Sequence, residues 1–222
     1  MEELQKINIL YEDNHLLVVE KPVNIPVCED ESGDNDLLNI LKKYLKDKYN
    51  KPGNVYLGLV HRLDRPVGGV MVFARTSKAA GRLSKQVQNH QLGKIYFAVC
   101  EGKVPDRGEW TDYLIKDNKK NQSFVTDKEH GKEAKLKFER LNYKDGLSLV
   151  KIALETGRSH QIRLQFSSHG FPLVGDAKYN PNSDKKTTVA LFAKSLSFEH
   201  PVTKEQLHFE LDIPKRYPFS LF

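Results

Sequence analysis

The stretch that decides the fold lies between residues 61 and 74 and reads HRLDRPVGGVMVFA. Its first half is charged, and its second half ends in five apolar residues typical of a buried strand. An aspartate flanked by Arg62 and Arg65 would stay ionised even when partly desolvated, because nearby positive charge offsets the cost of burying an anion. Asp64 is therefore a candidate nucleophile or base. The alternative, which spacing alone favours, makes Asp64 a turn residue before Pro66 and leaves both arginines in solvent.

Two further segments could carry chemistry. Residues 155–164 read ETGRSHQIRL, in which a glycine turn leads into a helix that carries Arg158 and Arg163. Such a helix start suits a phosphate or carboxylate partner, although by itself a capped surface helix is the simpler interpretation. Residues 94–99 read KIYFAV, a strand with alternating faces on which Tyr96 would ordinarily be a core residue.

The rest of the chain predicts short strands mixed with helices at irregular intervals. An amphipathic helix begins at the N-cap Asp36 and ends near residue 51, a second runs from a cap at Ser77 to His90, and a third covers 159–169. Strands are predicted at 7–11, 16–20, 70–74, 94–100, 110–115, 123–126, 134–141, 147–154, 195–198 and 207–211. This order favours an α+β fold with a mainly antiparallel sheet, in a single domain over residues 1–222.

Composition narrows the function classes. The chain has 222 residues, a formal charge of +6 and a pI near 9.1. This charge would attract a polyanion, but many basic proteins bind no nucleic acid. No apolar stretch is long enough to cross a membrane and the first residues are acidic, so we expect a cytoplasmic protein. Cys28 and Cys100 stand far apart and predict neither a disulfide nor a zinc site. His160 and His169 lack the spacing of metal ligands.

Together the three charged segments resemble the RluA-type family of RNA pseudouridine synthases. The resemblance covers nearly the whole chain, at residues 19–22, 61–64, 94–96, 156–163, 170–179 with its Val174-Gly175-Asp176, and 198–201. It implies a pseudouridine synthase fold with flanking helices and a catalytic cleft. It also implies isomerisation of uridine to pseudouridine in structured ribosomal or transfer RNA, by a monomer without cofactor or metal.

The resemblance assigns roles to matching residues. Asp64 takes the place of the essential aspartate, which attacks C1′ of the ribose or removes a ribose proton. Arg163 matches the arginine that pairs with this aspartate, and Tyr96 the tyrosine that stacks on the uracil. Arg62 would fill the space left by the flipped-out uridine, Leu164 would form an apolar pocket wall, and His61 would also contact the substrate.

Departures from the family pattern put the choice of substrate in doubt. Residues 66–69 read PVGG where many relatives have Asp-Thr-Ser-Gly after Asp-Arg, and Gln165 and Phe192 replace common histidines. Because the pattern starts by Ile7, we expect no N-terminal S4 domain and assign RNA affinity to the catalytic domain's own lysines and arginines. Two other functions remain open: a non-catalytic RNA-binding or ribosome-associated protein of the same fold, and a nucleoside hydrolase.

Overall fold

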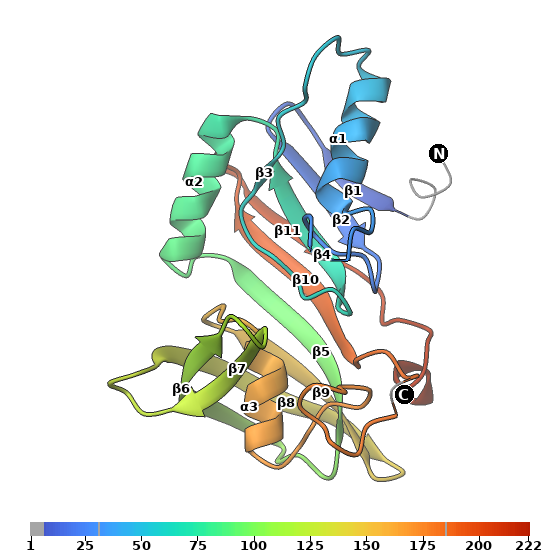
Figure 1. Cartoon of the computed structure of the whole chain (residues 1–222), viewed down its shortest axis with the longest axis vertical. Coiled ribbons are helices and arrows are strands. Elements are labelled where there is room, and N and C mark those ends of the chain that lie inside the picture. The colour runs from blue at the N-terminus through green and yellow to red at the C-terminus, as the bar shows by residue number, and fades with distance from the viewer. Residues whose placement is uncertain (1–6, 31, 185) are drawn as a thin grey trace. The chain divides into compact units, whose positions relative to one another are not determined.

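The computed structural model describes residues 7–30, 32–184 and 186–222 (Figure 1). The chain forms two compact units, each built from segments that are separate in the sequence. Unit 1 contains the described residues up to Leu92 and also Ser195–Leu211, whereas unit 2 contains Gly93–Lys194 and Asp212–Phe222. The single domain expected over residues 1–222 stays a prediction.

Unit 1 is built on antiparallel strands. β1 (Asn8–Glu12) pairs with β2 (Leu16–Lys21), and β2 pairs with β4 (Gly68–Ala74), which also pairs with the short β3 (Gly58–Leu59). The β1–β2 turn is held by Asp13, whose Oδ1 accepts the backbone N–H groups of His15 at 2.7 Å and Leu16 at 2.6 Å. The end of β10 (Leu191–Glu199) pairs with β11 (Gln206–Glu210). The predicted hairpin and strands are confirmed.

Unit 1 also contains the helices α1 and α2. α1 (Leu37–Lys48) begins at the predicted cap Asp36, whose carboxylate accepts the N–H of Asn39, and buries the apolar face predicted for it. α2 (Ser77–Gln88) is also confirmed, but its cap is Thr76 and not Ser77. Thr76 has an extended backbone and its Oγ1 accepts the N–H of Ala79 at 3.1 Å, so Ser77 already belongs to the first turn.

Unit 2 is an antiparallel meander with one α-helix. Its strands follow the spatial order β5 (Gly93–Glu101), β9 (Leu147–Leu154), β8 (Lys132–Lys144), β6 (Arg107–Asp117) and β7 (Gln122–Thr126). α3 (Gln161–Ser168) lies against β7 and β6. Its Phe166 belongs to an aromatic cluster, in which the centre of the Phe166 ring lies 4.8 Å from that of Trp110 and 5.8 Å from that of Phe138. A 3-10 turn, Phe219–Leu221, follows near the C-terminus.

The third helix is shorter than the sequence predicts. His160 adopts a left-handed backbone with φ of 53°, so the helix starts at Gln161, two residues later than expected, and His169 caps its end. Taken together, the elements confirm the α+β class and the mainly antiparallel pairing. Among the described residues, no helix has the length and apolar character needed to span a membrane.

Candidate active site

The HRLD segment lies in unit 1, between β3 and β4. Leu63 is buried, Arg62 is exposed, and His61 and Asp64 are half-buried. His61 is fixed to β4, because its Nε2 accepts the backbone N–H of Val72 at 3.1 Å. That acceptor role means that Nε2 carries no proton. This hydrogen bond therefore attaches the HRLD segment to β4.

A buried lysine holds the turn that follows Asp64. Lys21, at the end of β2, has 0% exposure, and its Nζ donates to the carbonyl oxygens of Pro22 at 3.1 Å, Arg65 at 2.9 Å and Val67 at 2.7 Å. The carbonyl of Asp64 in turn accepts the N–H of Val67 at 3.0 Å. Three carbonyl groups use all three N–H donors of an ammonium, so the backbone on both sides of the turn is fixed to β2.

The charge of Lys21 belongs to the same site. Burial lowers the pKa of its ammonium from 10.5 to about 7, whereas the negative charge of Asp64 raises the pKa and the positive charge of Arg65 lowers it. Lys21 is thus a residue of the site that the sequence reasoning missed. The available signal was a lysine that ends an apolar strand directly before a proline.

Of the two arginines that flank Asp64, Arg62 is exposed and Arg65 keeps 40% of its side chain exposed. Arg65 is half-buried and ion-paired with the loop before α1: Nη1 lies 3.5 Å from Asp30 Oδ2 and donates to Ser32 Oγ at 2.9 Å, and Nη2 contacts Asp34. Its guanidinium is therefore engaged by two aspartates outside the HRLD segment. This loop and the turn are linked again where Asn24 N–H donates to the carbonyl of Arg65 at 2.9 Å.

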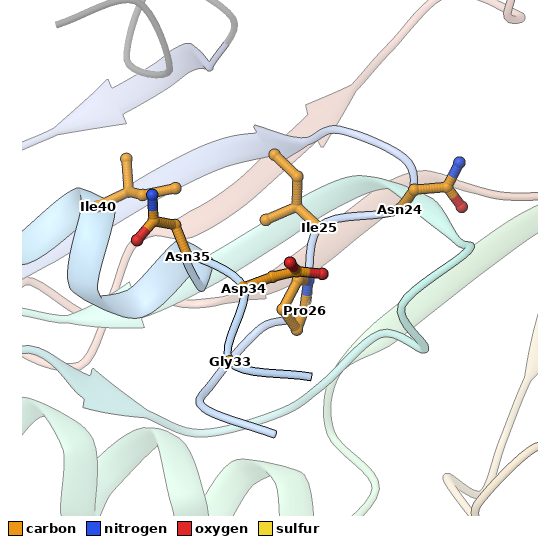
Figure 2. A pocket seen from close by; sticks show the side chains of 7 residues that line it. All are labelled: Asn24, Ile25, Pro26, Gly33, Asp34, Asn35 and Ile40. Carbon is orange, nitrogen blue, oxygen red and sulfur yellow. The ribbon is translucent and has the colours of Figure 1, made fainter. Parts of the chain in front are cut away.

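A pocket of about 390 Å³ lies beside this loop, in unit 1 (Figure 2). Figure 2 shows Ile40 extending from α1 and the other lining side chains from the segment that precedes the helix, including Asn24, Ile25 and Asp34. None of the six predicted site residues lines it. Its connection to the HRLD segment runs through Asp34, the ion-pair partner of Arg65.

Arg163 lies on α3 in unit 2 and is 5% exposed. Its Nε donates to Asp176 Oδ2 and its Nη2 to Asp176 Oδ1, both at 2.7 Å, so the two groups form a bidentate ion pair. Asp176 has 0% exposure and also accepts the N–H groups of Lys178 at 3.1 Å and Tyr179 at 3.3 Å. Because the guanidinium geometry matches a carboxylate in this way, Asp176 fixes the direction of the arginine. Asp176 belongs to the Val174-Gly175-Asp176 motif, for which the sequence predicted no role.

Gly175 explains how Asp176 reaches this position. Its φ of 76° lies in the left-handed region, and a Cβ there would lie 2.6 Å from the carbonyl oxygen of Thr188 and 2.7 Å from that of Thr187. Only glycine fits without displacing backbone. The Gly-Asp pair is therefore a sequence signal for a carboxylate presented by a tight turn.

Tyr96 and Leu164 are also in unit 2. Tyr96 lies on β5 opposite Ile152 and is buried, as is Leu164, which packs in a cluster with Leu114, Ala134 and Tyr179. Three predicted residues, Tyr96, Arg163 and Leu164, thus belong to unit 2, and His61, Arg62 and Asp64 belong to unit 1. The pairing of Asp64 with Arg163 and their shared cleft stay predictions.

Gln165, which stands where many relatives have a histidine, is fully buried and hydrogen-bonded. Its Nε2 donates to Asp112 Oδ2 at 2.8 Å and to the carbonyl of Ala134 at 3.1 Å, and its Oε1 accepts from Gln161 at 2.9 Å. His169 also contacts Asp112 at 3.1 Å. This network ties α3 to β6 and β8, so the replacement leaves the helix that carries Arg163 anchored.

The remaining histidine considered earlier has a structural partner. His160 Nδ1 lies 2.8 Å from the hydroxyl oxygen of Tyr179. Within residues 7–30, 32–184 and 186–222, no group of three or more histidine, cysteine, aspartate or glutamate side chains is arranged to hold a metal ion.

Comparison with known proteins identifies the family to which this chain belongs. The family described as RNA pseudouridylate synthase matches residues 15–168. The chain belongs to this family. It is 34% identical over 215 residues to an uncharacterized RNA pseudouridine synthase of Bacillus subtilis, covering 96% of this chain and 70% of that protein. It is 32% identical over 222 residues to the ribosomal large subunit pseudouridine synthase D of Zymomonas mobilis, covering 94% and 70% of the two chains.

Solved structures agree on the fold of this pseudouridine synthase. The human RNA pseudouridylate synthase domain containing 4 superposes with a TM-score of 0.81 at 22% identity, over 99% of this chain and 93% of that one. The human RNA pseudouridylate synthase domain containing 1 gives 0.75 at 22% identity, over 94% and 84%. The pseudouridine synthase fold and the isomerase class that the sequence predicts are confirmed.

Proposed function

We propose that this enzyme isomerises uridine to pseudouridine in structured RNA, with Asp64 as the catalytic carboxylate. One observation carries the proposal: Asp64 is half-buried in a turn whose backbone is fixed by the buried ammonium of Lys21. A carboxylate that acts on a ribose must be ionised and held in one place. The lysine supplies a rigid support and, in its protonated form, a nearby positive charge.

The other roles follow the family pattern. Arg163 would orient Asp64 from α3, Tyr96 would stack on the uracil, and Leu164 would close an apolar wall. Arg62, the exposed arginine of the segment, would occupy the space left in the RNA by the extruded uridine, with His61 beside it. Asp176 would keep the Arg163 guanidinium in a single orientation through its bidentate contact.

The reaction balances without a co-reactant. The C1′–N1 bond breaks, uracil turns in the pocket, and a C1′–C5 bond forms. C5 then loses its proton and N1 gains one. In the first step, Asp64 attacks C1′ or removes a ribose proton. We assign the substrate to ribosomal RNA before transfer RNA, because relatives with about one third identity are named for the large ribosomal subunit.

Tritium release from RNA labelled at C5 of uridine tests the catalyst. Asp64→Asn should abolish release while RNA affinity and melting temperature stay at the wild-type values, because the substitution removes one charge and keeps the shape. The matched control is Asp47→Asn, which removes an exposed carboxylate of α1 that pairs with Lys43 and should release tritium normally. Undiminished release by Asp64→Asn refutes the assignment. Mapping pseudouridines in cells with and without the gene identifies the RNA.

A further inference from the structure

The β6–β7 hairpin exposes apolar side chains in register. Ile115 and Phe124 are directly opposite one another on the two strands, so their side chains are neighbours on one face of the hairpin. They are 45% and 39% exposed, whereas Val125, the next residue of β7, points to the other face of the hairpin. Single exposed apolar residues are common on protein surfaces, but a contiguous group at the end of a hairpin indicates a contact surface.

Lysines surround this apolar pair. Lys119 and Lys120, in the turn of the hairpin, are exposed, and Lys120 Nζ lies 5.9 Å from the centre of the Phe124 ring. The one acidic residue between positions 113 and 126 is Asp117, whose carboxylate accepts the N–H groups of Lys119 and Lys120 and so caps the turn. The end of the hairpin is therefore apolar and positively charged at once.

The opposite face of the hairpin is anchored to α3. Ser123 is buried, its N–H donates to the hydroxyl oxygen of Tyr179 at 2.8 Å, and its Oγ donates to the carbonyl of Ser159 at 2.8 Å. Leu114 packs in the same cluster as Leu164. The exposed face thus sits on a hairpin that is attached to the helix carrying two of the predicted site residues.

We propose that Ile115, Phe124, Lys119 and Lys120, here called the hairpin tip, bind an unpaired nucleotide of the substrate RNA. A base stacks on the Phe124 ring and contacts Ile115, and the lysines contact the neighbouring phosphates. The inference rests on the proposed function, because it takes RNA as the substrate. Positive charge with an exposed aromatic ring suits single-stranded RNA, since bases in a duplex offer no free face for stacking.

Fluorescence anisotropy with two labelled RNA probes tests the hairpin tip: a stem-loop with an all-uridine loop, and the fully paired duplex of the same stem. Phe124→Ala should weaken binding of the stem-loop about tenfold and leave the duplex unchanged, because stacking on an unpaired base is lost. Phe124→Trp should retain the affinity. Lys120→Gln should lower the slope of log affinity against log salt by roughly one unit.

Tyr143 provides the matched control. It is 41% exposed on the β8–β9 hairpin of the same unit, with Lys103 Nζ at 5.8 Å and the guanidinium carbon of Arg140 at 6.0 Å from its ring centre. Tyr143→Ala should bind both probes like the wild type. Equal losses in Tyr143→Ala and Phe124→Ala, or an unchanged Phe124→Ala, overturn the proposal. So does a Phe124→Ala variant that binds RNA normally but loses a protein partner.

Tritium release by the wild type separates this inference from the proposed function. A wild type that binds the stem-loop through Phe124 but releases no tritium contradicts the proposed function and supports the hairpin tip. A wild type that releases tritium, with Phe124→Ala binding unchanged, supports the proposed function and overturns the hairpin tip.

Discussion

Asp176→Asn removes one partner of the Arg163–Asp176 ion pair and keeps the shape of the side chain. Both groups are almost inaccessible, with exposures of 5% for Arg163 and 0% for Asp176, and both hydrogen bonds are 2.7 Å long. Loss of one member of a buried ion pair typically destabilises a protein by about 3–5 kcal/mol. An asparagine oxygen can still accept from the N–H groups of Lys178 and Tyr179, so we expect the lower end, about 3 kcal/mol.

Urea unfolding followed by circular dichroism measures this change in the free energy of unfolding. The matched control is Asp106→Asn, which breaks an ion pair with Arg140 whose aspartate side chain is 86% exposed. A surface pair contributes at most about 1 kcal/mol. If Asp176→Asn and Asp106→Asn destabilise the protein equally, the buried pair does not fix the Arg163 guanidinium as we describe.

A double-mutant cycle with Arg163→Met checks the pairing itself. Once Asp176 is replaced, the bidentate contact is already gone, so loss of the guanidinium should cost less stability than it does in the wild type. The loss in the double variant should therefore be smaller than the sum of the two single losses. We expect a coupling energy of about 2 kcal/mol. Simple additivity would show that the two side chains act independently.

Two more predictions concern residues that hold the site. Burial lowers the pKa of Lys21 to about 7, so between that pH and 10.5 the folded protein binds fewer protons than the unfolded chain, and this lysine makes stability rise with pH. Between pH 7 and pH 9, the unfolding free energy of the wild type should therefore rise by about 2 kcal/mol more than that of Lys21→Met. If urea unfolding gives the same change with pH for both proteins, the prediction is wrong. Gly175→Ala should lower the melting temperature more than Gly170→Ala, since both positions have left-handed backbones but a methyl group at 175 meets Thr188 O at 2.6 Å whereas nothing lies within 4 Å at 170. Equal shifts would show that the backbone angle alone sets the loss of stability.

The local elements were predictable because they depend on neighbouring residues. Short aliphatic runs on either side of a turn located β1 and β2, and the cap at Asp36 with helical spacing located α1. The errors fell at boundaries, where one hydrogen bond decides the outcome. Thr76 takes the cap of α2 because its hydroxyl reaches Ala79, and the left-handed backbone of His160 delays the start of α3.

The sequence by itself determined the α+β class, the family and the positions of the candidate catalytic residues, because periodicity and motif spacing are local properties. Only the tertiary structure showed what supports those residues. Lys21 meets the carbonyl groups of Arg65 and Val67 from 44 and 46 positions away, and Arg163 meets Asp176 across 13. Such contacts depend on how strands and helices pack. A buried charged group and its partner come together only in the folded chain, where both are removed from water.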